Sequence, residues 1–304
     1  MLINRATGRD PAEAHRVSTT LELFFDLVFV VAIAMAASSL HHDIVEDRIR
    51  HGLISYLLVF FAIWVAWINF TWFASAFDTS DLPYKLLVFV QMTGALILAA
   101  GVPEAFEDRQ FGIVIVGYVV MRLALVAQWL RVAWQAPIYR STALRYAIGT
   151  TIAQIGWVAW LVSDLNDALW VFILLAVLEL AVPFWAESAR ATPWHPEHIQ
   201  ERYGLFTIIV LGECVLAASL AVQTIDDLSA ISRDLVGIVI GGLLTLYSLW
   251  WLSFGLRGEQ ETESLRSAFI WGYGHYVIWA ATAASGVDIS VAVDATAHSV
   301  VGEQ

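Results

Sequence analysis

Long apolar runs separated by short polar links dominate the chain. They predict nine membrane-spanning helices, at residues 19–40, 52–77, 84–101, 111–130, 145–163, 168–187, 203–222, 234–256 and 267–287. Each run approaches the ~20 residues that cross a hydrocarbon core about 30 Å thick. We therefore expect an all-α polytopic membrane protein, with one helical bundle over 19–287 between polar tails at 1–18 and 288–304.

The amino-acid composition supports a membrane protein and limits the kinds of molecule that the protein could bind. Hydrophobic residues make up 59% of the chain and charged residues only 14%, against about 25% charged residues in soluble domains. The net charge is −12 and the chain has a single Lys, which argues against nucleic acid because nucleic-acid binding needs a basic face. The expected partner is the lipid bilayer. Gly237 and Gly241 form a GxxxG motif that also permits a homo-oligomer.

The basic residues of the links predict the orientation of the chain. With a cytoplasmic N-terminus, the inner segments hold eleven basic residues: Arg5, Arg9, Arg16, Lys85, Arg131, Arg140, Arg145, Arg190, Arg202, Arg257 and Arg266. The outer segments hold four: Arg48, Arg50, Arg109 and Arg233. Because Lys and Arg are enriched in cytoplasmic loops, this bias predicts that the N-terminus lies inside the cell.

Ionisable side chains within the apolar runs are the first candidates for function. Glu22 and Asp26 are four residues apart, so both project from one face of the first helix. Glu213 lies near the middle of the seventh run, Glu179 lies in the sixth, and Arg122 is expected to face Asp26, Glu179 or Glu213. Charged groups at membrane depth are costly and usually face protein or water. We expect these groups to converge in one interior cavity, a pattern that favours a pathway for an ion, a proton or a substrate.

His275, in the motif WGYGH, completes the set of buried candidates. A structural alternative stays open, in which these groups only form internal salt bridges that fix the order of the helices. Phe60, Trp64 and Trp67 form a stripe at helical spacing on the second helix, which we interpret as packing.

A polar cluster precedes the seventh run. His198, Glu201 and Arg202 are expected at its entrance, with His195 nearby. His and carboxylate side chains suit zinc, but Pro196 interrupts the cluster and no HExxH motif is present. We therefore interpret the cluster as a solvated, helix-capping surface and predict no metal site.

Several cofactor and enzyme classes lack their residues in this sequence. A retinal pigment needs a buried Lys for its imine, and Lys85 lies at a helix end. No P-loop, GxSxG or HExxH motif is present, and these motifs carry phosphate, serine-hydrolase and zinc-protease chemistry. We predict no cofactor.

Two motifs resemble a known family. ELFFDLVFVVAI at 22–33 and HIQERYGLFTIIVLGE at 198–213 are similar to the bacterial low temperature requirement A (LtrA) family. The resemblance implies a multi-pass protein of the bacterial inner membrane that is linked to growth in the cold. It matches Glu22, Phe25, Asp26, Glu201, Arg202, Gly204, Glu213 and His275 to family positions. Family members continue into further hydrophobic helices, so the resemblance implies a shortened member, and it supplies neither a reaction nor a substrate.

Three functional hypotheses follow from these residues. The first is a secondary transporter or channel for a small ion or solute, in which Asp26 and Glu213 exchange protons or bind a cation, while Arg122 attracts an anion or holds the resting pair. The second is a structural or regulatory membrane protein, whose buried charges order the bundle. The third is an enzyme acting on a lipid-borne substrate through Glu201, His198 and Arg202. The absence of any recognised catalytic motif makes the enzyme the least favoured of the three.

Overall fold

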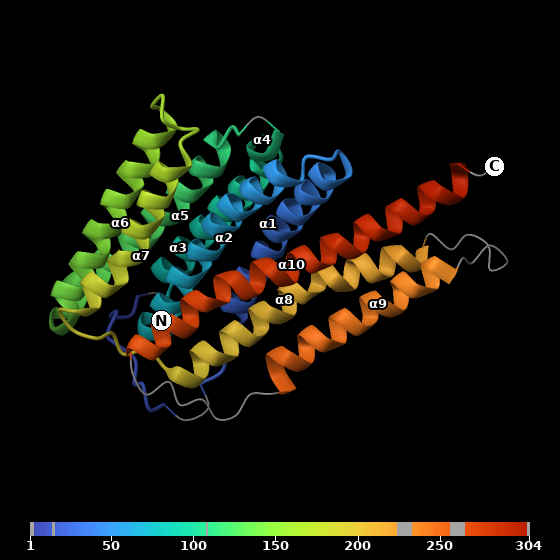
Figure 1. Ribbon diagram of the computed structural model, residues 1–304. Helices are drawn as coiled ribbons and strands as arrows, with labels where there is room; N and C mark the ends of the chain where they lie inside the picture. The colour runs from blue at the N-terminus through green and yellow to red at the C-terminus, as the bar shows by residue number, and fades with distance from the viewer. Residues whose placement is uncertain (1–2, 14–15, 108, 224–232, 256–264, 303–304) are drawn as a thin grey trace. The chain divides into compact units, whose positions relative to one another are not determined.

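The computed structural model describes residues 3–13, 16–107, 109–223, 233–255 and 265–302, and every regular element among them is helical. In chain order these are α1 (Thr20–Val45), α2 (Ile49–Phe77), α3 (Leu82–Ala100), α4 (Val102–Glu107), α5 (Gly112–Gln135), η1 (Pro137–Tyr139), α6 (Arg140–Leu161), α7 (Leu169–Glu187), α8 (Pro196–Gln223), α9 (Arg233–Trp250), η3 (Trp251–Gly255) and α10 (Leu265–Gly302) (Figure 1). The predicted all-α polytopic class is confirmed.

Eight helices of the described chain are long and apolar enough to cross a membrane, against nine predicted spans. The difference is α6, which has 22 residues but falls outside the apolar set. Its sequence includes Arg140, Arg145 and Gln154, which lower its mean hydropathy. At 1.5 Å per residue α6 is still about 33 Å long, and it packs against both α5 and α7.

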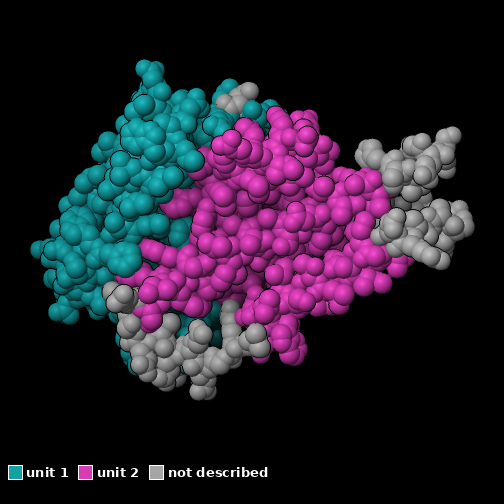
Figure 2. Space-filling model, in the orientation of Figure 1, with its two compact units in different colours: residues 1–32, 62–202 teal, residues 33–61, 203–304 magenta. Residues whose placement is uncertain are grey.

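The chain divides into two compact units, which Figure 2 colours separately. Unit 1 comprises residues 1–32 and 62–202, and unit 2 comprises residues 33–61 and 203–304. Each of α1, α2 and α8 therefore contributes to both units. The relative positions of the two units are not determined, so each is described by itself.

Unit 1 is built on close helix packing. The α3 and α5 helices meet at Gly94 and Gly117, where a Cβ on Gly117 would lie 2.3 Å from the backbone nitrogen of Leu98. Only glycine fits this contact, because a side chain would have to displace backbone atoms. Further along α5, the rings of Trp129 and Tyr146 stack with their centroids 4.1 Å apart, which packs α5 against α6.

The polar N-terminal segment of unit 1 lies against helix ends. The backbone N–H of Ala6 donates to Gln135 Oε1 over 2.8 Å, and that of Arg9 donates to the carbonyl oxygen of Ala76 over 3.0 Å. The Arg16 guanidinium donates to the carbonyl oxygens of Ala74 and Ser75 at the end of α2. These bonds satisfy carbonyls that a helix C-terminus leaves without partners.

Asp81 organises the same end of unit 1. It caps α3 by accepting from the N–H of Tyr84 over 3.2 Å, and it accepts from Arg131 Nη1 over 2.9 Å. Burial opposes ionisation of the Asp81 carboxyl, but the Arg131 guanidinium and the backbone N–H of Asn4 outweigh it, so the pKa of Asp81 lies below its usual range.

In unit 2, α10 is helical from Leu265 to Gly302, so residues 288–302 of the predicted polar tail continue this helix. A Cβ on Gly286 would lie 2.8 Å from the backbone carbon of Glu213, which shows that α10 and α8 pack closely there. Gly237 and Gly241 of the GxxxG motif have no neighbouring atom within 4 Å of a built Cβ. Within the described residues this motif therefore contacts no other helix, and a homo-oligomer stays a prediction.

Candidate functional site

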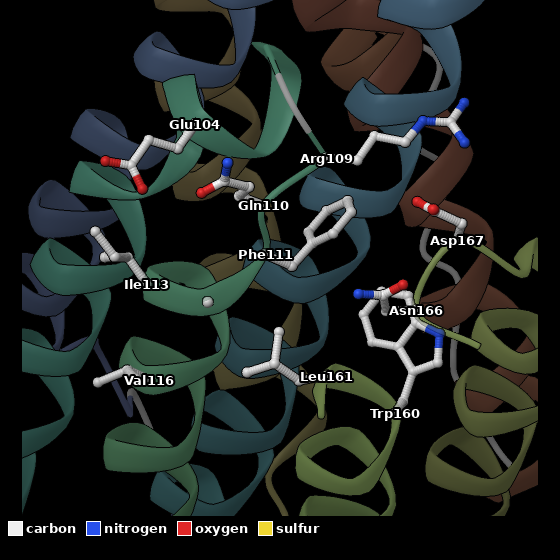
Figure 3. Close-up of a pocket in the computed structure, with 11 residues that line it drawn as sticks. Glu104, Arg109, Gln110, Phe111, Ile113, Val116, Trp160, Leu161, Asn166 and Asp167 are labelled. Carbon is white, nitrogen blue, oxygen red and sulfur yellow. The ribbon is translucent and has the colours of Figure 1, made fainter. Parts of the chain in front are cut away.

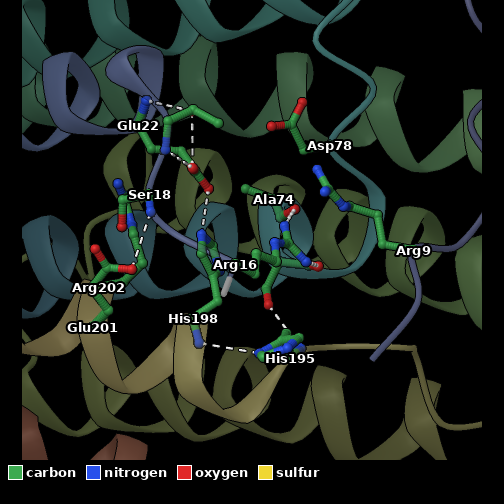
Figure 4. Close-up of polar contacts among 12 residues, drawn as sticks. Arg9, Arg16, Ser18, Glu22, Ala74, Asp78, His195, His198, Glu201 and Arg202 are labelled. Carbon is green, nitrogen blue, oxygen red and sulfur yellow. Dashed lines mark hydrogen bonds and ion pairs between the residues drawn. The ribbon is translucent and has the colours of Figure 1, made fainter. Parts of the chain in front are cut away.

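Four ionisable side chains of unit 1 form two adjacent pairs between the beginnings of α1 and α8. Asp26 Oδ1 lies 2.7 Å from Arg202 Nη2, and Glu22 Oε1 lies 3.2 Å from His198 Nε2. All four side chains are at least 98% buried. Figure 4 shows Glu22 approaching His198, with Arg202 and Glu201 nearby on the same helix. We call Glu22, Asp26, His198 and Arg202 the four-residue cluster.

Helical periodicity explains why the two pairs are adjacent. Glu22 and Asp26 are one turn apart on α1, and His198 and Arg202 are one turn apart on α8. Residues four apart lie on one face of a helix. Two helices that begin side by side and run in the same direction therefore bring the acids and the bases together as successive pairs.

Local signals in the sequence start both helices. Glu22 Oε2 accepts from Thr19 N over 2.8 Å, while Thr19 Oγ1 accepts from Glu22 N over 3.2 Å. This reciprocal arrangement is a capping box, whose Thr-x-x-Glu signature can be read directly from the sequence. The α8 helix has Pro196 as its first residue, a position where proline is favoured because the N–H that it lacks needs no partner.

The structure corrects the prediction that the segment before the seventh run is a solvated surface. We expected a helix from residue 203, but α8 starts at Pro196, and the extra two turns bury His198 and Arg202 completely. Glu201 stays half-buried, and its Oε2 accepts from the N–H of Ser18 over 3.1 Å. Arg202, like Arg122, is therefore a buried arginine.

The four-residue cluster combines unequal charges with incomplete bonding. With both carboxyl groups ionised, the two carboxylates and the one guanidinium sum to −1. Asp26 Oδ2 and both Nε and Nη1 of Arg202 lack hydrogen-bond partners among the described residues. Buried charges that are not fully bonded are costly, so these atoms favour binding of water, an ion or a proton.

Trp67 is a member of this site that sequence reasoning missed. We interpreted its aromatic stripe as packing, but Trp67 Nε1 donates to Asp26 Oδ1 over 2.7 Å, and the Arg202 guanidinium lies 5.8 Å from its ring centroid. The indole of Trp67 could have indicated this role from the sequence, because a buried Trp N–H usually requires an acceptor.

A second buried ion pair joins α5 and α7 within unit 1. Of the three acids that we considered for Arg122, the structure pairs it with Glu179: Arg122 Nη2 lies 2.7 Å from Glu179 Oε1. The Tyr118 hydroxyl donates to the same oxygen over 2.6 Å, and Trp157 Nε1 donates to Glu179 Oε2 over 2.8 Å. Both carboxylate oxygens of Glu179 are therefore bonded, and the arrangement resembles a clamp between α5, α6 and α7.

Glu213 and His275 lie in unit 2. Glu213 is half-buried on α8, and its carboxylate makes no hydrogen bond or ion pair within the described chain. His275 Nδ1 lies 2.7 Å from the carbonyl oxygen of Trp271, and its ring is packed among the rings of Tyr203, Trp271 and Trp279. The convergence of these two side chains with those of unit 1 in one cavity stays a prediction. In the described residues, no group of three or more His, Cys, Asp or Glu side chains has the arrangement of a metal site.

Comparisons with known proteins identify the family. The family model described as bacterial low temperature requirement A protein (LtrA) matches residues 17–304. The chain is also similar to a protein of Rhizobium meliloti (strain 1021) described as uncharacterized, with 28% identity over 275 residues. That alignment covers 84% of this chain and 65% of the relative. No solved structure matches the chain. The protein therefore belongs to the bacterial low temperature requirement A family and is a multi-pass membrane protein.

Proposed function

We propose that this protein is a secondary transporter or channel of the bacterial inner membrane, in which the four-residue cluster binds and releases the coupling proton. The observation that carries the proposal is the contact of two carboxyl groups with one arginine and one histidine in a site buried at the start of two spanning helices. Ionisable groups inside a membrane protein commonly mark proton or ion routes. When both carboxyl groups are ionised, uptake of one proton would remove the net charge of the cluster.

Asp26 is the central group of the proposed mechanism. One of its oxygens accepts from both Trp67 and Arg202, while the other has no partner in the described chain. Protonation of Asp26 would weaken its hold on Arg202, because the attraction depends on the carboxylate charge. The released guanidinium could then attract an anionic solute. This exchange couples a proton to a second ligand without requiring a cofactor.

The experiment measures proton flux in proteoliposomes that contain a pH-sensitive dye and face an imposed pH gradient and membrane potential. We expect the wild type to exceed protein-free liposomes and Asp26→Asn to abolish the excess, because the amide cannot cycle a proton. Glu197→Gln is the matched control, since it neutralises an exposed carboxylate in the first turn of α8 and leaves the four-residue cluster intact. Equal flux for wild type and Asp26→Asn would refute the proton role of the cluster.

Glu213→Gln tests the second carboxylate. Because the Glu213 side chain is unpaired within the described chain, we expect the amide to lower flux while leaving thermal stability close to that of the wild type. Loss of stability with unchanged flux would instead assign Glu213 to the architecture of unit 2.

A structural or regulatory role is the second candidate, and the clamp at Glu179 favours it. Both oxygens of its carboxylate already accept hydrogen bonds, from Arg122, Tyr118 and Trp157, as expected of a contact that holds helices together. If this role is correct, no gradient produces flux above the liposome background. The enzyme hypothesis is less well supported, because His198 and Arg202 are completely buried against α1.

A further inference from the structure

The four-residue cluster is buried although it lies at the beginnings of two helices. Glu22 is in the first turn of α1 and His198 is in the first turn of α8, and both side chains are at least 98% buried. The first turn of a helix that spans a membrane lies near the level where the bilayer meets water. A neighbouring segment must therefore cover the cluster at this end of unit 1.

Residues 16–19, which directly precede α1, lie over this end and are held by polar contacts. The Arg16 guanidinium is buried, acts electrostatically on the Glu22 carboxylate and donates to two carbonyl oxygens at the end of α2 (Figure 4). The backbone N–H of Ser18 donates to Glu201 Oε2, on α8, over 3.1 Å. These contacts join the segment to both sides of the cluster. We call residues 16–19 the lid.

The lid has no apolar anchor. Val17 is 69% exposed, and among the described residues that precede α1 only Ala6 and Arg16 are buried. A segment held by hydrogen bonds alone can exchange them for hydrogen bonds to water, so its net gain from each bond is small. Segments with few buried apolar contacts open at low free energy. The lid is therefore built to open while the helices stay folded.

On the opposite side, towards the middle of the helices, aromatic rings close the cluster. The ring centroids of Phe25 and Phe70 lie 4.0 Å apart, and those of Phe25 and Phe29 lie 4.9 Å apart. All three side chains are at most 1% exposed. Separating these rings would sacrifice tightly packed apolar contacts, which is costly. The lid is therefore the side of the cluster that opens at the lower cost.

The cavity of unit 1 gives no access to the cluster. This cavity has a volume of about 510 Å³ and lies around the beginning of α5 (Figure 3). The segment that precedes the lid instead contacts Gln135 at the end of α5, and the 24 residues of this helix span about 36 Å. No residue of the cluster or of the lid lines the cavity. Water that enters this cavity therefore does not reach the cluster.

We propose that the lid is the gate through which the four-residue cluster exchanges its proton with water, and that the bonds from Arg16 to the end of α2 are its latch. When the guanidinium leaves these carbonyl oxygens, water reaches Glu22 and His198 at the beginnings of their helices. The gate rests on the proposed function, because it supplies the access route to the proton site of the transporter. The opening of the lid itself can be measured without transport.

Hydrogen exchange followed by mass spectrometry on the purified full-length protein measures this opening. Arg16→Gln removes the charge of the latch. The matched control, Arg9→Gln, removes a charge that pairs with Glu13 in the same segment. We expect Arg16→Gln to raise exchange in the second turns of α1 and α8 roughly tenfold over the wild type and the control, the effect of one lost hydrogen bond from a charged donor.

Three results of the exchange experiment would overturn the lid. Equal exchange of Arg16→Gln and Arg9→Gln in α1 and α8 would show that Arg16 is not a latch. Faster exchange confined to the last turn of α2 would show that Arg16 only caps that helix. A rise of the same size in α5 and α6 would show a general loss of stability instead of a local opening.

A reversible cross-link tests whether the lid must move for proton flux. In the Cys214→Ser background, Ser18→Cys and Glu201→Cys place two thiols at the contact between the lid and α8, and a short bifunctional methanethiosulfonate reagent joins them through disulfides. We expect the flux in proteoliposomes to fall at least tenfold and to recover on reduction. The Ser18→Cys protein without the second cysteine is the control, and it should keep its flux in the presence of the reagent.

Unchanged flux after complete cross-linking would refute the gate. Absence of flux in the wild type would instead refute the proposed transport and with it the gate, while the exchange experiment would still decide whether the lid opens.

Discussion

The clamp at Glu179 makes a quantitative prediction about buried charge. Replacing Arg122 with Leu leaves the Glu179 carboxylate buried with only two neutral donors, the Tyr118 hydroxyl and the Trp157 indole. Breaking a buried pair by removing one partner typically costs about 3–5 kcal/mol. Because Arg122 and Glu179 are 98% and 96% buried, screening by solvent does not reduce this cost, and we expect Arg122→Leu to fall in that range.

The double variant Arg122→Leu/Glu179→Leu should be more stable than Arg122→Leu alone. It removes both charges, so the remaining cost is the loss of acceptors for Tyr118 and Trp157. Hydrogen bonds inside membrane proteins contribute about 0.6 kcal/mol on average, with a maximum near 1.7. We therefore expect the double variant to lose only about 1–3 kcal/mol.

Reversible unfolding in mixed micelles of increasing SDS content provides the free energies for this double-mutant cycle. Trp157→Phe is the control, because it removes one neutral donor and should cost no more than about 2 kcal/mol. If the double variant loses as much stability as the sum of the losses of Arg122→Leu and Glu179→Leu, then the two charges do not interact energetically.

Two further predictions concern the ends of the helices. The pKa of the Asp81 carboxyl is lowered in the folded protein, so its contribution to stability is present above the unfolded value of about 3.9 and is lost as the pH falls through the lower folded value. The thermal stability of the wild type in detergent should fall below about pH 4. Asp81→Asn should be less stable than the wild type at pH 7 and should lose less stability as the pH falls below about 4. Parallel pH profiles of thermal stability for the two proteins would contradict this. The predicted orientation can be tested because Cys214 is the single cysteine and is buried. In a Cys214→Ser background, a cysteine at exposed Asp10 should resist a membrane-impermeant maleimide in intact cells and one at exposed Asn166 should react, and the opposite labelling would reverse the topology.

The candidate site was partly predictable from local spacing. The i, i+4 relation of Glu22 and Asp26 predicts a shared face, and the structure places both against α8. The start of α8 was not predicted, because hydropathy alone cannot distinguish a charged first turn from a surface link. Pro196 was interpreted as an interruption, whereas it is the first residue of the helix.

The partner of Arg122 shows why the remaining contacts could not be predicted. Three acids were compatible with it by depth alone, and the structure pairs it with Glu179 through the packing of α5 against α6 and of α6 against α7. The indole donors of Trp67 and Trp157 were missed for the same reason. An aromatic stripe indicates a buried face, but it does not indicate which acceptor lies opposite.

The sequence by itself determined that this is a helical membrane protein, because the length and apolarity of a span are properties of one continuous segment, and its two motifs indicated the LtrA family. Only the tertiary structure decided which charges meet. Pairing at depth depends on the rotation and the neighbours of each helix, and these are set by contacts between residues far apart in the chain, such as Asp26 with Arg202. The cost of desolvation explains why a buried charge is paired, but it does not specify which residue becomes the partner.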